Sequence, residues 1–180
     1  FCDGDSVVLS VTNNPAYTYK WSRSGVPVGS NNSKFIAKTS GVHSLTVENS
    51  YSCIANASGI ISVTVKSKPS IPAITPIGNT TFCNGDSIQL IYNNSATGLY
   101  YQWKLNSDVL STGTDIKSIK AKTTGTYSLI VNNTDNCFAT SSNSIPVNVA
   151  QTPSSPTINT VGSITFCQGD SVILNVTNNP

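Results

Sequence analysis

The chain has 180 residues, with 10 Lys and Arg against 8 Asp and Glu and a formal net charge of +2. Because the basic residues are few and scattered, there is no basic stripe of the kind that binds nucleic acid. No apolar run approaches the roughly 18 residues that a membrane-spanning helix needs, so direct membrane insertion is not expected. Ser, Thr, Asn and Val dominate, and Met is absent. This composition favours strands and turns over helices, and predicts an all-β protein.

One segment occurs three times along the chain. "FCDGDSVVLSVTNNP" at 1–15 returns as "FCQGDSVILNVTNNP" at 166–180, and "FCNGDSIQL" occupies 82–90, so the cysteines of these segments are 81 and 84 residues apart. A repeat of this length is long enough to fold as a small domain. We therefore expect a segment of a longer protein, divided into repeat 1 without its leading strand (1–67), repeat 2 with its Pro-containing joint (68–150), and a joint with the first strands of repeat 3 (151–180).

Each repeat begins with a strand that follows a Gly-Asp turn. The alternation in 6–11 and 87–92 places Leu9 and Leu90 on the apolar face of a half-buried strand. The next strand carries "YKW" at 19–21 or "YQW" at 101–103, in which Tyr and Trp share one face. Because Trp is the largest apolar side chain available to a small core, we assign two tryptophans to the cores, Trp21 and Trp103.

The second half of each repeat contains a corner between two strands. In 34–49 and 116–133, a strand leads to Thr-Ser-Gly or Thr-Thr-Gly, and a second strand follows with Leu45 or Leu129 facing inward. A long, weakly alternating strand then closes each repeat, at 59–67 or 143–151. The total is about seven strands per repeat, which predicts tandem immunoglobulin-like β-sandwich domains.

The only histidine, His43, occupies this corner in repeat 1, and Tyr127 occupies it in repeat 2. In immunoglobulin-like sandwiches a tyrosine at this position bonds back to the backbone through its hydroxyl, and a histidine ring nitrogen can make a similar bond. We therefore expect a structural role for both side chains rather than a catalytic or ligand-binding one.

The five cysteines sort by repeat. This logic predicts the pairs Cys2–Cys53 and Cys83–Cys137 and leaves Cys167 without a partner within the sequence. Closing a loop of about 50 residues would stabilise each domain by roughly 4 kcal/mol, and disulfides imply an oxidising compartment. The alternative is that the cysteines are reduced and unpaired. A zinc site is not expected, because there is no CxxC motif and no neighbouring histidine.

An aspartate follows glycine in the first turn of every copy, at Asp5, Asp86 and Asp170. Calcium takes six to eight oxygen ligands, so one carboxylate per turn is too few, and we expect the aspartate side chain to cap the turn. No metal and no cofactor are expected. The chain also lacks a nucleophile beside a histidine base, a matched carboxylate pair and a phosphate-binding loop, so we expect no enzymatic activity.

Several motifs together resemble a known family. They are "FCxGDSVxL", the "YxW" strand, the corner seen in "TSGVHSLTV" and "TGTYSLIV", and the cysteine-containing hairpins "YSCIANAS" and "DNCFATSS". The combination, which covers essentially the whole chain, resembles the tandem Ig-like repeats of large secreted and cell-surface adhesins of gliding and related Bacteroidota bacteria.

The resemblance implies a structural stalk or display array, exported by a type IX-like secretion route to the cell surface, in a protein that serves adhesion or surface motility. The Pro-bearing joints "SKPSIPAITP" and "QTPSSPTI" suit a stalk, since they favour extended backbone. The resemblance also implies O-glycosylation at the Asp-Ser-aliphatic motifs, which would modify Ser6, Ser87 and Ser171.

Two other functions remain open. The chain could be a glycan-binding module that stacks loop aromatics on sugar rings, or an accessory region of a secreted polysaccharide-acting enzyme. The candidate aromatics are Tyr17, Tyr51, Tyr100 and Phe138. The expected partners are neighbouring repeats, and beyond them glycans, other cell-surface proteins or further copies of the chain paired along exposed strand edges.

Overall fold

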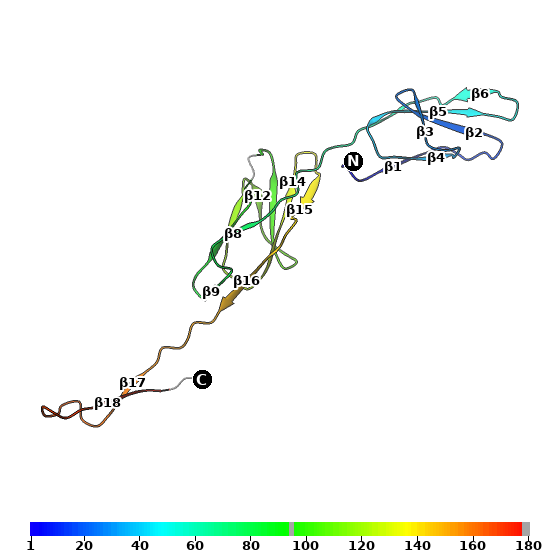
Figure 1. Cartoon of the computed structure of the whole chain (residues 1–180). Coiled ribbons are helices and arrows are strands. Elements are labelled where there is room, and N and C mark those ends of the chain that lie inside the picture. Colours follow the sequence, from blue (N-terminus) through cyan, green and yellow to red (C-terminus); the bar gives the residue numbers. More distant parts are fainter. Residues whose placement is uncertain (94–95, 178–180) are drawn as a thin grey trace.

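The computed structural model of the chain describes residues 1–93 and 96–177, which contain strands and no helix. Two β-sandwiches and a separate hairpin follow one another end to end (Figure 1). The prediction of tandem Ig-like β-sandwiches is thereby confirmed. Within the described ranges, no helix is long and apolar enough to cross a membrane.

The first sandwich contains seven strands. A two-stranded sheet pairs β1 with β4, and a five-stranded sheet has the order β3-β2-β5-β6, with β7 also paired to β5. The strands are β1 (Val7–Ser10), β2 (Thr18–Arg23), β3 (Val26–Val28), β4 (Lys34–Ala37), β5 (Gly41–Glu48), β6 (Ile54–Asn56) and β7 (Ile61–Val63).

The second sandwich contains nine strands among the described residues, more than the seven expected. Its sheets have the orders β13-β10-β8 and β12-β11-β14-β16-β9, with β15 beside β14. The strands are β8 (Thr75–Ile77), β9 (Thr81–Cys83), β10 (Ile88–Ile91), β11 (Tyr100–Leu105), β12 (Asp108–Thr114), β13 (Ser118–Ala121), β14 (Gly125–Asn132), β15 (Phe138–Thr140) and β16 (Ile145–Ala150).

Alternating side chains from the two sheets form the core of each sandwich. The buried side chains of the first core are Leu9, Tyr19, Trp21, Ala37, Leu45 and Val63. The second core is larger and includes Leu90, Tyr101, Trp103, Tyr127, Leu129 and Val131. Each indole Nε1 donates a 2.8 Å hydrogen bond to a backbone carbonyl, Trp21 to Asn32 and Trp103 to Ile116, so the polar edge of each buried ring has a partner.

The two sandwiches differ at one edge. In the second sandwich β10 lies between β13 and β8, whereas in the first its counterpart β1 has only β4 as a neighbour. Among the described residues, the first sandwich has no strand equivalent to β8. Trp21 keeps 6% of its surface exposed and Trp103 none, so the smaller sheet covers its core less completely.

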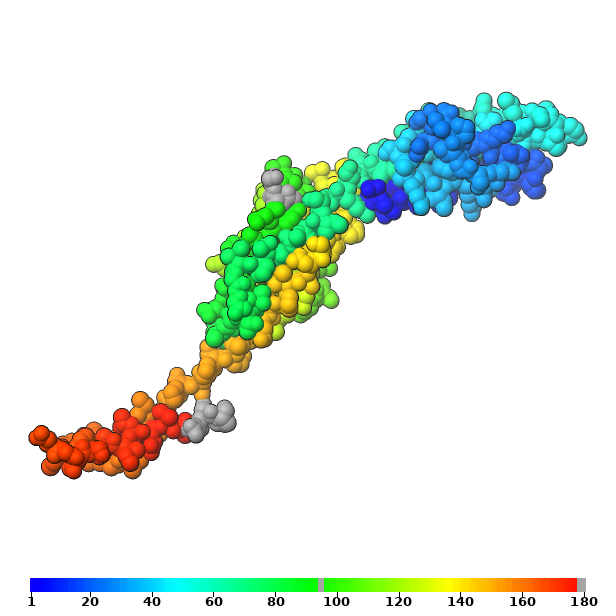
Figure 2. Space-filling view, in the orientation of Figure 1, coloured from blue at the N-terminus to red at the C-terminus, as the bar shows by residue number. Residues whose placement is uncertain are grey.

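The third copy forms a hairpin of β17 (Ile158–Val161) and β18 (Ile173–Val176). Its pairing of Val161 with Ile173 corresponds to that of Ile77 with Gln89 between β8 and β10, so the same register recurs 84 residues later. The hairpin stands apart from the second sandwich (Figure 2), and its apolar side chains are exposed.

Candidate functional site

The segment that joins the two sandwiches also pairs with the start of the chain. The first residues of the chain run parallel to the segment that leaves the first sandwich, and Cys2 lies opposite Lys66. Lys66 donates its amide to the carbonyl of Phe1 at 2.8 Å, and Asp3 donates to the carbonyl of Lys66 at 2.8 Å. The start of repeat 1 is therefore held at the end that faces repeat 2.

A tight loop of the second sandwich meets this segment. The loop connects β14 to β15, and the side-chain oxygen of Asn133 accepts the amides of Asp135 and Cys137 at 3.1 and 3.0 Å. Asn136 adopts a φ of 59°, which asparagine tolerates better than most residues. This local network presents the Cys137 side chain toward the first sandwich.

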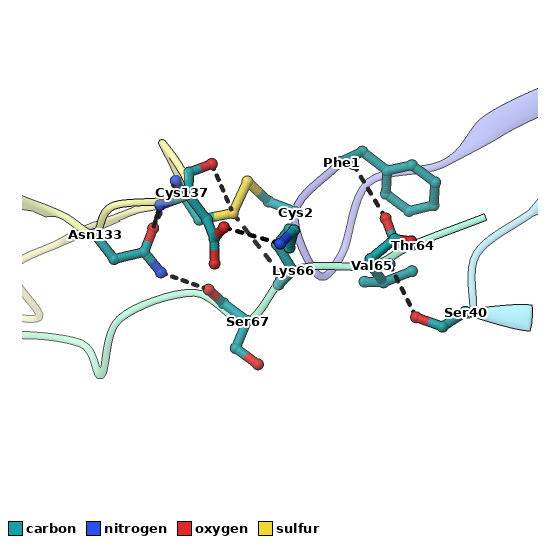
Figure 3. Close-up of polar contacts among 10 residues, drawn as sticks. Phe1, Cys2, Ser40, Thr64, Val65, Lys66, Ser67, Asn133 and Cys137 are labelled. Atoms are coloured by element: carbon teal, nitrogen blue, oxygen red, sulfur yellow. Dashed lines mark hydrogen bonds and ion pairs between the residues drawn. A yellow bond between two sulfur atoms is a disulfide. The ribbon is translucent and has the colours of Figure 1, made fainter. Parts of the chain in front are cut away.

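A disulfide joins the two sandwiches at this point. Cys2 and Cys137 are bonded across a sequence separation of 135, with their Cα atoms 5.6 Å apart (Figure 3). The predicted pairs Cys2–Cys53 and Cys83–Cys137 are therefore wrong. Cys53, Cys83 and Cys167 are free and exposed.

The length of β5 explains the error. Val65 donates its amide to Ser40 Oγ at 2.9 Å, and Cys2 lies opposite the next residue, Lys66. Cys2 is therefore at the start of β5, whereas Asn49 and Cys53 follow the end of β5. A strand of this length spans about 26 Å, and bonded cysteines have Cα atoms within about 7 Å. In repeat 2, Cys83 and Cys137 likewise lie at opposite ends of β14.

Two polar contacts reinforce the disulfide. Asn133 Nδ2 donates a 2.7 Å hydrogen bond to the carbonyl of Ser67 (Figure 3). Lys66 Nζ lies 3.0 Å from Asp135 Oδ1. The ion pair is solvent-exposed, so it contributes about 0–1 kcal/mol, less than the disulfide. We call this set the joint: Cys2, Lys66, Ser67, Asn133, Asp135 and Cys137.

The corner residues lie in the cores rather than at the joint. Tyr127 donates its hydroxyl to the carbonyl of Thr123 at 2.9 Å, and His43 places Nδ1 3.1 Å from the carbonyl of Gly41. His43 is 1% exposed, and its Nε2 has no partner among the described residues. Within those residues no group of three or more His, Cys, Asp or Glu side chains is arranged to hold a metal.

The three turn aspartates are exposed, and the backbone closes their turns. The amides of Asp5, Asp86 and Asp170 donate to the carbonyls of Cys2, Cys83 and Cys167 at 3.0–3.1 Å. The neighbouring serines of the three motifs, Ser6, Ser87 and Ser171, are also exposed.

The structure does not gather the candidate aromatics into one surface. Tyr17 lies in a shallow groove of about 600 Å³ that is lined mainly by asparagines, including Asn13, Asn14 and Asn31. Tyr51 is 85% exposed in the loop before Cys53, while Tyr100 is on β11 and Phe138 on β15. The groove of Tyr17 thus has a polar lining suited to a sugar.

Reasoning from the sequence missed the joint as a site. The "FC" segment of each repeat pairs in parallel with the last strand of the same repeat, as β9 and β16 show for Cys83 and the pairing of Cys2 with Lys66 shows for repeat 1. This pairing places the cysteine at the end of its repeat from which the chain leaves. The sequence holds no signal for it, because the pairing follows from the strand order.

No protein-family model matches the chain, and no curated protein is significantly similar to it. Solved structures that resemble it include murine CEACAM1b, at 18% identity over 83% of this chain and 94% of that one, with a TM-score of 0.42. The fibronectin(III)-like modules of Clostridium thermocellum CbhA have 13% identity over 84% and 88%, with a TM-score of 0.43. The three N-terminal domains of the bacteriophage RB49 Hoc protein have 16% identity over 99% and 67%, with a TM-score of 0.36.

Proposed function

We propose that the chain is part of a structural stalk in a cell-surface adhesin, in which tandem Ig-like repeats hold a terminal binding element away from the cell. The observation that carries the proposal is the joint. A disulfide, a parallel backbone pairing and the Asn133–Ser67 hydrogen bond connect successive sandwiches. Such connections limit bending, and a stalk must keep its length under load.

The distribution of the aromatics also favours a spacer over a binding module. A recognition surface places several aromatic anchors together, whereas Tyr17 and Tyr51 belong to repeat 1, and Tyr100 and Phe138 flank Asn132 in repeat 2. The proposal assigns the chain no enzymatic activity. Disulfide formation and the all-β fold suit an extracellular protein, and the motif resemblance supports a Bacteroidota adhesin that serves adhesion or surface motility.

Small-angle scattering tests the stalk directly. We expect the native chain to scatter as an extended particle with a defined maximum dimension. Cys137→Ser should broaden the distance distribution, because it removes the disulfide and leaves the polypeptide segment as the one covalent connection between the sandwiches. Cys53→Ser is the matched control, since Cys53 occupies the equivalent loop but is free. A distance distribution of the native chain as broad as that of Cys137→Ser would contradict a rigid stalk.

A glycan-binding role is the second candidate, and the asparagine-lined groove beside Tyr17 is the observation that favours it. Amide side chains hydrogen-bond sugar hydroxyls, and a tyrosine ring stacks on a sugar face. A glycan array should show no saturable binding if the chain is only a spacer. Binding that Tyr17→Ala abolishes and Tyr100→Ala preserves would establish this groove as the glycan site.

The motif resemblance also supports O-glycosylation of the three exposed serines, Ser6, Ser87 and Ser171. We expect peptides with these serines to carry a glycan mass when the protein is isolated from the cell surface of its own bacterium. Unmodified masses on all three peptides would contradict this part of the proposal.

A further inference from the structure

The five cysteines occupy two structural positions. We call Cys2, Cys83 and Cys167 the start-turn cysteines and Cys53 and Cys137 the hairpin cysteines. Cys2 lies opposite Lys66, and Cys83 lies opposite Ala150, in each case through parallel pairing with the end of the same repeat. The following residue donates its amide across the pair at both places, Asp3 to Lys66 at 2.8 Å and Asn84 to Ala150 at 2.7 Å.

The two hairpin cysteines sit in loops of identical geometry. The Asn49 side-chain oxygen accepts the amides of Tyr51 and Cys53, both at 3.0 Å, just as Asn133 accepts those of Asp135 and Cys137. Ser52 has a φ of 61° and its counterpart Asn136 one of 59°. Cys53 is therefore presented at the end of repeat 1 that lies away from the joint, as Cys137 is presented at the joint.

The connecting segments also have equal length. Pro69 and Pro72 follow Lys66 at the same intervals as Pro153 and Pro156 follow Ala150. The next sheet then starts in the same register, as the β8–β10 and β17–β18 pairings show. The number of residues from Ala150, opposite Cys83, to Val161 of β17 is thus the same as from Lys66, opposite Cys2, to Ile77 of β8.

We infer that every joint in an array of these repeats carries one disulfide, from the start-turn cysteine of one repeat to the hairpin cysteine of the next. Cys83 then bonds the hairpin cysteine of a following repeat, and Cys53 bonds the start-turn cysteine of a preceding repeat. The partner at both sites is another Ig-like repeat of this kind. The bonded pair Cys2–Cys137 supplies the geometry. The equivalent backbone contacts place Cys83 in the position of Cys2 and Cys53 in the position of Cys137.

The ion pair of the joint is not part of this pattern. Ala150 stands where repeat 1 has Lys66, and Tyr51 stands where repeat 2 has Asp135. The disulfide is therefore the contact that the repeats share, and the ion pair is specific to the joint between repeats 1 and 2. Cys137 is fully buried when bonded, so pairing should also bury the exposed Cys53 and Cys83.

Each bond forms by thiol–disulfide exchange with a small disulfide such as oxidised glutathione. One cysteine thiolate attacks the glutathione disulfide, forms a mixed disulfide and releases one reduced glutathione. The second cysteine thiolate then displaces the other glutathione. Two cysteine thiols are oxidised to one disulfide, and one glutathione disulfide is reduced to two thiols, with the two protons passing to the released thiolates.

The first test is the disulfide map of the 180-residue chain, refolded with oxidised and reduced glutathione and alkylated before digestion. We expect one linked peptide pair, Cys2 with Cys137, and alkylated Cys53, Cys83 and Cys167. Linked peptides of Cys2 with Cys53, or of Cys83 with Cys137, would overturn the inference, because bonding within repeats would then be the rule.

The decisive test extends the full chain after Pro180 with a second copy of residues 97–150. This copy completes repeat 3 in the alignment of the repeats and adds one hairpin cysteine, a copy of Cys137. We expect the added cysteine to bond Cys83, while Cys53 and Cys167 remain alkylated. Cys83→Ser should leave the added cysteine alkylated, and the matched Cys167→Ser should leave the new bond intact.

Two results of this second test would overturn the inference. One is a bond between the added cysteine and Cys167, which would be a staple within repeat 3. The other is alkylation of Cys83 in the extended chain. Neither result bears on the stalk, because scattering and glycan binding are measured on the native 180-residue chain, whose joint contains only the Cys2–Cys137 bond.

Discussion

Among single residues, the corner between two strands is filled by a different side chain in each repeat. Tyr127 fills the corner of repeat 2 and reaches the backbone of Thr123 through its hydroxyl. In repeat 1 the smaller His43 stands there, and its ring lies 5.6 Å from the ring of Phe35. The strand pairing places Ile119 where repeat 1 has Phe35, so the larger neighbour accompanies the smaller corner residue.

This exchange predicts coupling between the two positions. His43→Tyr alone should destabilise repeat 1 by about 1–3 kcal/mol, because Phe35 already fills the space and the core is overpacked. Combining it with Phe35→Ile should recover most of the loss. Urea unfolding monitored by Trp21 fluorescence, in a Trp103→Phe background, measures both. Additive losses in the double variant would contradict the account.

A second residue-scale contrast concerns two tyrosines at the same strand position. The Tyr19 hydroxyl lies 2.6 Å from the amide of Asn14, which donates to it, whereas the Tyr101 hydroxyl is buried without a partner among the described residues. Burial raises the pKa of Tyr101 above its usual range, with smaller contributions from Tyr92 and Asp115. The raised pKa and the missing partner both reflect the burial of the Tyr101 hydroxyl.

These environments predict opposite effects of one substitution. Tyr101→Phe should leave stability unchanged or raise it by up to about 1 kcal/mol, since it removes an unpaired buried polar group. Tyr19→Phe should cost about 1 kcal/mol, because Asn14 loses its partner. Chemical denaturation of the two variants gives the comparison, and a larger loss for Tyr101→Phe would show that its hydroxyl is bonded.

At the element scale, a glycine begins the strand that follows each corner. Gly41 and Gly125 both have a φ of +151°, where side chains are unfavourable. A Cβ atom on Gly125 would lie 2.5 Å from Leu105, which packs on the core, whereas one on Gly41 would lie 2.7 Å from the Arg23 side chain. The backbone requirement is the same, but the neighbours differ in their freedom to move.

We therefore expect unequal costs from the same change in the two corners. Gly125→Ala should destabilise repeat 2 by about 2–4 kcal/mol, because backbone strain adds to a clash with a packed leucine. Gly41→Ala should cost only about 1–2 kcal/mol, since the arginine can swing into solvent. Denaturant midpoints of the two variants test the order, and a greater loss for Gly41→Ala would refute it.

At the scale of the whole molecule, the two sandwiches have unequal cores joined by one disulfide. The first core buries fewer side chains, and its small sheet lacks a counterpart of β8. Since hydrophobic stabilisation grows with the apolar area buried, repeat 1 should be the less stable unit. Each sandwich contains one tryptophan, which allows the two unfolding reactions to be followed separately.

Fluorescence should therefore resolve two transitions. With Trp103→Phe, the remaining signal should report unfolding of repeat 1 at a lower denaturant concentration than the Trp21→Phe variant reports for repeat 2. Reducing the Cys2–Cys137 bond should shift both midpoints and leave their order unchanged. Coincident midpoints for the two variants would mean that the joint makes the sandwiches a single cooperative unit.

The repeats, the all-β fold and the residues that point inward could be predicted from the sequence, because they depend on local periodicity and on comparison of one repeat with the next. Trp21 and Trp103, and the leucines that accompany them, lie in the two cores where alternation placed them. The disulfide was different. Whether two cysteines meet depends on which end of a sandwich each occupies, and the parallel pairing of Cys2 with Lys66 sets this for the first repeat. The strand order in three dimensions is therefore needed to show that the disulfide links successive domains rather than closing a loop within one domain.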